Sequence, residues 1–189
     1  MINMRDIVFQ LKKTIDEKVP ALSHTLQEGA SHEEIEELEN VTGVNLPETF
    51  KTFYLTCNGQ KNGDTGLTEM GEILSISAIL SKWNGWKSLH IKNNLTDFKS
   101  DPDKGIRDNW FNLKWIPFTY NGSSDHFCID MDPDNGGNIG QVITIWHDSP
   151  ERELVAVSFE DWIKNYIADL KAGKFKYDPE LGNLEKLYD

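Results

Sequence analysis

The sequence predicts a single domain of the α+β class, with a mostly antiparallel β-sheet packed against helices. Three observations lead to this class. A central meander of short strands occupies residues 115–157, where β-branched and aromatic segments alternate with turn residues. Helical patterns flank the meander on both sides, with apolar residues three or four positions apart. The length of 189 residues suits one domain with extensions.

The meander begins with three strands within residues 115–147. Asn121-Gly122 is a hairpin signal between the first two strands, because both residues tolerate the positive φ angles of a tight turn. The glycine-rich segment 133–140 predicts a second turn before the third strand. After a turn at 149–152, residues 153–158 predict a fourth strand.

Two helices are predicted before residue 46. Apolar residues at fourfold spacing from Ile7 to Val19 predict the first helix, which Pro20 ends. Ser31 and Glu34 form a capping box for the second helix, since each side chain can bond the other residue's backbone N–H. Gly43 ends that helix, because glycine tolerates the left-handed conformation that follows a last turn.

Three more helices are predicted further along the chain. Pro47 suits the start of a helix that ends at residues 58–59. A short strand at 71–76 precedes a helix over 78–86, for which Ser77 is the expected cap, and residues 92–110 have a loop-like composition. Ser158 with Asp161 caps a final helix with an aromatic stripe, which we interpret as a core face.

The expected domain organisation has three parts. Residues 1–30 form an N-terminal helical extension, residues 31–172 the main domain, and residues 173–189 a C-terminal polar tail. The tail is expected either to be loose or to pack along the surface. Cys57 and Cys128 lie far apart without metal-ligand spacing, so both are interpreted as small core residues.

The charge balance limits the possible partners. The chain carries 19 Lys and Arg against 31 Asp and Glu, a formal net charge of −12. Phosphate backbones bind clusters of Lys and Arg, so nucleic acid is not expected as a partner. No segment approaches the roughly 18 consecutive apolar residues of a membrane span, so no membrane partner is expected and the expected location is the cytoplasm.

The charge is also unevenly distributed. Segment 82–115 carries seven basic and four acidic residues, whereas segment 121–153 carries seven acidic residues and one arginine. Half of the net charge therefore lies on the meander and the turn that follows it. This asymmetry points to an interaction surface that could steer a basic partner.

The acidic and histidine residues of the meander suggest two kinds of chemistry. Asp130-x-Asp132-x-Asp134 resembles the start of a calcium loop, but position 6 is Asn135 and position 12 is Gln141, which cannot supply the bidentate carboxylate. His126 and His147 could meet across neighbouring strands as a metal or acid–base site. The chain has no metal-ligand spacing, nucleophile elbow or phosphate-binding loop, so no catalytic residue, metal ligand or cofactor is predicted.

Four motifs in order resemble the SUKH superfamily, named in part for the Smi/Knr-type cell-wall-assembly regulators. The first is the acidic helix, Gly43-x-x-Leu46-Pro47 junction and aromatic helix of residues 33–60. The others are residues 115–118, the turn and strand from Asp130 to Ile143, and Phe159-x-x-Trp162-Ile163. Together they cover about residues 31–170.

The resemblance implies an α+β domain with an antiparallel sheet backed by helices and no enzymatic activity. Many bacterial members are immunity proteins that neutralise a polymorphic toxin, often a nuclease, by direct binding. The leading hypothesis is therefore an immunity protein that binds a basic toxin. The expected partner-binding residues are acids of the meander and two tryptophans: Asp125, Asp130, Asp132, Asp134, Asp148, Glu151, Trp83 and Trp86.

Two alternatives remain open. The first is a cell-wall-assembly-type regulatory scaffold that binds a cellular protein. The second is a metal-dependent or acid–base hydrolase that uses His126 and His147.

Overall fold

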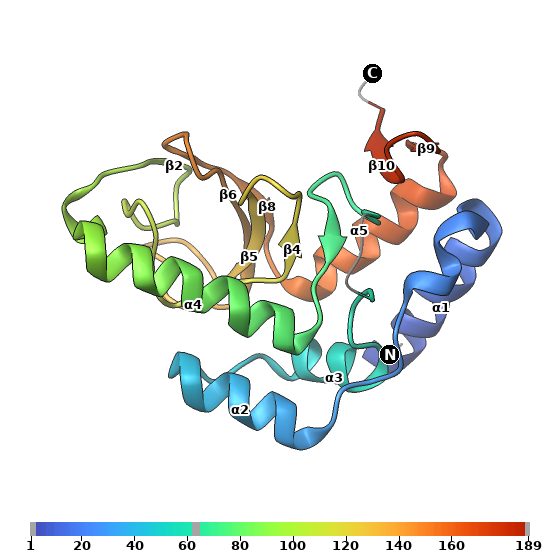
Figure 1. The fold of residues 1–189 in the computed structure, drawn as a ribbon, viewed down its shortest axis with the longest axis horizontal. Helices are drawn as coiled ribbons and strands as arrows, with labels where there is room; N and C mark the ends of the chain where they lie inside the picture. Colours follow the sequence, from blue (N-terminus) through green and yellow to red (C-terminus); the bar gives the residue numbers. More distant parts are fainter. Residues whose placement is uncertain (1–2, 62–64, 188–189) are drawn as a thin grey trace.

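The computed structural model describes residues 3–61 and 65–187 and shows an α+β fold (Figure 1). The helices are α1 (Met4–Lys18), α2 (His32–Thr42), α3 (Glu48–Thr56), α4 (Ile76–Asn93) and α5 (Phe159–Lys171), with 3-10 turns η1 (Pro20–Thr25) and η2 (Leu95–Asp97). The strands are β1 (Glu72–Ile73), β2 (Asp101–Pro102), β3 (Trp115–Pro117), β4 (Thr119–Tyr120), β5 (His126–Asp130), β6 (Gln141–Ile145), β7 (Glu151–Arg152), β8 (Leu154–Ala156), β9 (Phe175–Asp178) and β10 (Asn183–Lys186).

The main sheet is the predicted meander. Its four strands lie in the order β3-β5-β6-β8, and every neighbouring pair is antiparallel. Trp115 pairs with Asp130, and His126 pairs with Ile145, so β5 and β6 run side by side over their whole length. The α+β class and the antiparallel sheet are confirmed.

Both faces of this sheet are buried, because every residue of β5 and β6 is buried. Phe127, Ile129 and Val142 belong to the core that the helices α1, α3 and α5 complete. On the opposite face, Cys128 and Ile143 pack with side chains from the 82–114 stretch, among them Trp86 and Phe111. This stretch therefore covers one face of the sheet, with α4 running alongside it in Figure 1.

Local signals set most helix ends as expected. Ser31 Oγ accepts the Glu34 N–H, and Glu34 Oε2 accepts the Ser31 N–H at 2.8 Å, which completes the capping box. Gly43 follows that helix with φ = 70°. Ser158 Oγ accepts the Asp161 N–H at 3.1 Å. These contacts span at most three residues, so the sequence predicts them well.

The start of α4 differs from the prediction. Ser75, not Ser77, is the cap, and its Oγ accepts the Ala78 N–H at 3.3 Å. The helix also continues past residue 86 to Asn93, where Asn94 takes a left-handed conformation with φ = 50°. Helix formation continues through Gly85 because Trp83 and Trp86 are both buried and hold the helix against the sheet. Within the loop-like segment 92–110, residues 101–102 form β2, which pairs in parallel with β7.

Both ends of the described chain pack onto the domain. Helix α1 lies against α3 and α5, and its apolar face is part of the main core. In the predicted polar tail, β9 and β10 form an antiparallel hairpin, and Leu184 is buried in the same core. Cys57 and Cys128 are buried and free. Across residues 3–61 and 65–187, no helix is long and apolar enough to cross a bilayer.

Candidate functional site

The expected partner-binding acids lie at opposite ends of the β5–β6 pair. Asp130, Asp132 and Asp134 are at the closed tip, where the chain turns from β5 into β6. Asp125 precedes β5, and Asp148 and Glu151 follow β6 at the open end. The structure therefore does not bring the six acids together into one surface.

Asp130 is a buried structural residue. The residue is 0% exposed, and its carboxylate accepts hydrogen bonds from Trp115 Nε1 at 3.0 Å, Gln141 Nε2 at 2.9 Å and the backbone N–H of Asp132 at 2.9 Å. Burial raises the pKa of Asp130, although these hydrogen bonds act in the opposite direction. A partner has no access to this carboxylate in the structure.

Asp132 is neutralised within the chain. Its carboxylate forms an ion pair with Arg107 Nε at 3.0 Å, accepts Asn112 Nδ2 at 3.0 Å, and lies 3.8 Å from Lys114 Nζ. Partial burial alone would raise the pKa of Asp132, but these three groups lower it. Part of the negative charge of the meander is thus balanced within the chain, because basic residues of the 82–115 segment form ion pairs with it.

The two tryptophans are in the interior. Trp83 is 2% exposed and donates its Nε1–H to Leu113 O at 2.8 Å. Trp86 is 7% exposed and stacks on Phe111 at a ring-centroid distance of 4.6 Å. Both rings anchor α4 and the following stretch to the sheet, so neither is presented as an exposed aromatic anchor. Of the expected set, Asp134, Asp148 and Glu151 are the exposed members.

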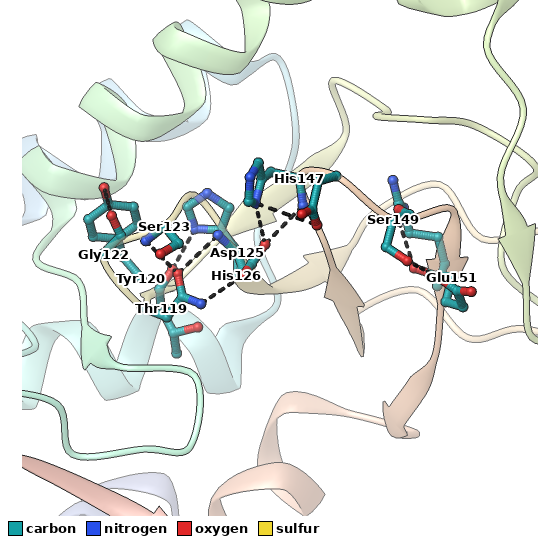
Figure 2. Close-up of polar contacts among 12 residues, drawn as sticks. Thr119, Tyr120, Gly122, Ser123, Asp125, His126, His147, Ser149 and Glu151 are labelled. Atoms are coloured by element: carbon teal, nitrogen blue, oxygen red, sulfur yellow. Dashed lines mark hydrogen bonds and ion pairs between the residues drawn. The ribbon is translucent and has the colours of Figure 1, made fainter.

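At the open end, Asp125 holds His147 by two hydrogen bonds (Figure 2). Its Oδ1 accepts the backbone N–H and ring Nδ1–H of His147, both at 2.9 Å, and its Oδ2 accepts Asn121 Nδ2 at 2.7 Å. Burial would raise the pKa of Asp125, but the bonds from His147 and Asn121 lower it. The bond to Asp125 in turn raises the pKa of His147, so this pair favours a charged imidazolium.

His126, unlike His147, favours the neutral imidazole. It is 1% exposed, and its Nδ1–H donates to Thr119 O at 2.6 Å, which leaves the lone pair on Nε2. Burial lowers the pKa of His126 to about 4, and nearby Lys82 acts in the same direction. Among the described residues, Nε2 has no hydrogen-bond partner. His126 is therefore a neutral acceptor at neutral pH.

Both histidines line a groove of about 660 Å³ between α4 and the open end of the sheet. Its other walls include Lys82 and Trp86 of α4, Trp110, and Tyr120 of β4. The Lys82 ammonium lies 3.4 Å from the centroid of the Tyr120 ring, and the His126 ring stacks on the same tyrosine with 5.7 Å between the ring centroids. A concave, largely apolar site with a few convergent polar groups is typical of a binding site.

The sequence pattern singled out the two histidines of this groove but did not predict Lys82, Tyr120 or Gly85 as lining residues. Lys82 and Tyr120 are 38 positions apart in the sequence, and no local pattern connects them. The detectable signal was Gly85, because glycine inside a predicted helix carries a cost and calls for a reason.

One set of side chains at the open end could hold a cation. Ligand atoms of Asp125, His147 and Asp148 all lie within 4.8 Å of one another. His147 Nδ1 lies 2.9 Å from Asp125 Oδ1 and 3.9 Å from Asp148 Oδ1, so a divalent cation there would compete with the hydrogen-bonded proton. The Asp125–His147 pair also has the arrangement of a carboxylate-oriented base, but no described hydroxyl or thiol is bonded to the other ring nitrogen.

Lowering the pH from 6.5 to 4 is expected to destabilise the fold through His126. Because the pKa of His126 is about 4 in the folded chain and near 6.5 when unfolded, the unfolded chain binds more protons in this window. The free energy of unfolding should fall as the pH falls, by up to about 3 kcal/mol from this group. His147, with its raised pKa, acts oppositely and at higher pH.

Urea denaturation at intervals between pH 4 and pH 7 measures this effect. The His126→Gln variant should lose stability less steeply over the same window, because its side chain does not titrate. Equal slopes for the two proteins would contradict the prediction.

Comparisons with known proteins match the part of the chain that carries the four motifs. The sequence model of the SMI1 / KNR4 family (SUKH-1) matches residues 29–165. KNR4/SMI1 homolog 2 of Debaryomyces hansenii is 22% identical over 89% of this chain and 36% of its own length. The cell wall assembly regulator SMI1 of Saccharomyces cerevisiae is 20% identical over 82% of this chain and 38% of its own.

The glucan synthesis regulatory protein of Neurospora crassa is 21% identical over 93% of this chain and 40% of its own length. The chain thus spans less than half the length of these curated relatives.

Proposed function

Because the chain belongs to the SMI1 / KNR4 family (SUKH-1), we propose that it is a non-catalytic domain that acts in the cytoplasm by binding a partner protein. The relatives named as regulators of cell wall assembly and of glucan synthesis support a role exerted through protein contacts. The proposed partner-binding surface is the open end of the β5–β6 pair, comprising Asp148, Glu151 and the adjoining groove.

The observation that carries this surface is the difference between the two ends of the sheet. At the closed tip, hydrogen bonds and ion pairs within the chain occupy Asp130 and Asp132. At the open end, Asp148 lies 3.9 Å from His147 Nδ1 and Glu151 accepts the Ser149 hydroxyl, yet both acids remain exposed, the Asp148 side chain by 75%. Glu151 also pairs in register with the exposed Asp101. Exposed charges of one sign attract a partner of the opposite sign and raise its association rate.

Two biological roles fit such a surface. In the first, the chain is an immunity protein whose acidic edge covers the basic site of a toxin. A nuclease toxin would have such a basic site, because its substrate-binding surface must attract phosphate. In the second, it is a regulator that holds a cellular protein, as the names of the relatives suggest. The two roles differ in their effect on the partner's own activity, since an immunity protein abolishes that activity on binding.

Charge reversal at the open end is expected to weaken partner capture about tenfold or more, because two favourable contacts become repulsive. The test is a quantitative pull-down from the source cell with the wild type and with a D148K/E151K variant. A D134K variant is the matched control, since Asp134 is an exposed acid at the closed tip.

The proposal predicts that the partner is retained by D134K and lost by D148K/E151K. Adding the purified chain to the captured partner then shows whether the partner's enzymatic activity stops, which identifies an immunity protein. Equal recovery by all three proteins would refute the proposed surface.

A further inference from the structure

The open-end groove contains features that the fold itself does not require. Gly85 lies within α4, away from either end, and a Cβ atom built there would meet nothing within 4 Å. Its backbone does not require glycine either, since it is not among the residues with positive φ. Glycine inside a helix destabilises it relative to alanine. Gly85 lines the groove, so its missing side chain widens that space.

The polar groups of the groove define what it could accept. His126 Nε2 is a lone-pair acceptor, because the Nδ1–H is held by Thr119 O at 2.6 Å. A molecule bound in the groove must therefore supply an N–H or O–H donor to His126 Nε2. Because Nε2 has no partner among the described residues, a ligand that donates to it adds a hydrogen bond that the chain alone does not make.

The charge of the lining is positive. Lys82 lies over the Tyr120 ring and forms no ion pair with a described residue, whereas the charge of His147 is balanced by Asp125 at 2.9 Å. Among residues 3–61 and 65–187, no aspartate or glutamate lines the groove. An occupant that carries a carboxylate beside Lys82 would complement this lining, whereas a basic occupant would be repelled.

Apolar surface completes the site. Leu89 is 47% exposed on the same face of α4, one turn after Gly85, and Trp110 and Trp86 form apolar walls. A volume of about 660 Å³ holds one or two large side chains of a peptide.

We propose that this groove takes an extended segment of the partner protein, which places an apolar side chain over Gly85, donates a main-chain N–H to His126 Nε2 and sets a carboxylate beside Lys82. This inference rests on the protein-binding function proposed above and adds the chemistry of the partner segment. The partner would thus carry an acidic-apolar segment for the groove next to a basic patch for Asp148 and Glu151.

A library of random dodecapeptides displayed on phage, selected against the full chain, tests the chemistry without the natural partner. Enriched peptides are expected to share an apolar residue next to an aspartate or glutamate. Synthetic versions are then titrated calorimetrically against the wild type and against Gly85→Leu, Lys82→Glu and Asn84→Leu. Asn84 is exposed on α4 and does not line the groove, so it controls for adding the same apolar side chain to the helix.

Gly85→Leu and Lys82→Glu should each weaken peptide binding at least tenfold, while Asn84→Leu should not. Gly85→Ala should raise the Tm by about 2–4 °C, since alanine favours the helix and meets no neighbour, yet it should weaken binding. A higher Tm together with weaker peptide binding would indicate that Gly85 serves binding and not the stability of the helix.

Three results would overturn the inference: no peptide enriched above background, enrichment of basic peptides, or equal affinity for Gly85→Leu and wild type. The pull-down separates this inference from the proposed function. If Gly85→Leu captures the natural partner as well as the wild type while D148K/E151K loses it, the groove inference fails and the proposed function stands. If Gly85→Leu alone loses the partner, the groove inference stands and the charged edge fails.

Discussion

Replacing Arg152 by methionine is expected to lower the free energy of unfolding by about 3–5 kcal/mol. Arg152 is 0% exposed, and its guanidinium donates to the carbonyl oxygens of Ser149, Glu151 and Trp110 at 2.6–2.7 Å. Methionine fills a similar volume but leaves these carbonyls without their donors.

The sign of this prediction depends on two opposing terms. Burial of the cation is costly, and it lowers the pKa of Arg152 to about 10. No carboxylate among the described residues forms a salt bridge with it, so the cost is offset by the three carbonyls and by the Trp110 ring, 5.2 Å away. Losing several charge-assisted hydrogen bonds, each worth roughly 1.5–3 kcal/mol, outweighs the desolvation saved.

Arg107→Met is the matched control for this measurement. Arg107 is also an arginine with a defined partner, but its side chain is 44% exposed and it pairs with Asp132 at the surface. Its loss should cost less than about 1 kcal/mol. Urea denaturation of both variants at pH 7 decides the matter. If Arg152→Met is as stable as the wild type or more stable, the cost of burying the cation dominates and the prediction is wrong.

Replacing Gly71 by alanine should destabilise the protein by more than about 3 kcal/mol. Gly71 has φ = 82°, and a Cβ atom there would lie 2.0 Å from Tyr120 O and 2.6 Å from the Asn121 Cα. Both are backbone atoms, so a rotamer change cannot relieve the overlap. The turn that contains Gly71 would have to move away from β4 and the hairpin that follows it.

Gly43→Ala separates the two causes of this effect. Gly43 has φ = 70°, but a Cβ atom there would meet nothing within 4 Å. This variant carries the cost of the left-handed backbone alone, about 1–2 kcal/mol. Thermal and urea unfolding of the two variants should therefore differ by the cost of the overlap. Similar losses at both positions would show that backbone conformation, not close approach, is the reason for Gly71.

These substitutions also connect the fold with the proposed surface. Arg152 fixes the backbone of Ser149 and Glu151, and therefore holds the exposed Glu151 in its place beside Asp101. Gly71 lies against the segment that leads from Tyr120 to Asp125, and this segment positions the histidines. Both variants should weaken partner capture through stability, whereas D148K/E151K should leave stability unchanged.

The sequence by itself determined the elements that depend on neighbours within a few positions. The capping box at Ser31 and Glu34, the left-handed Gly43 and the cap at Ser158 are all present. The β-branched and aromatic segments separated by turn residues also determined the meander, because adjacent strands joined by short turns pair with each other. Where two serines were available, Ser75 and Ser77, the local signal was ambiguous and the prediction was wrong.

Only the tertiary structure decided which polar side chains face a partner. Asp130 became buried because Trp115 and Gln141 meet it across strands, and Asp132 found Arg107 and Asn112 from the covering stretch. The same packing buried Trp83 and Trp86 and left Gly85 facing a groove. Helix caps and helical periodicity act over about four residues, whereas burial and the hydrogen bonds across strands depend on segments that meet only after folding. Composition could therefore suggest an acidic surface but could not locate it.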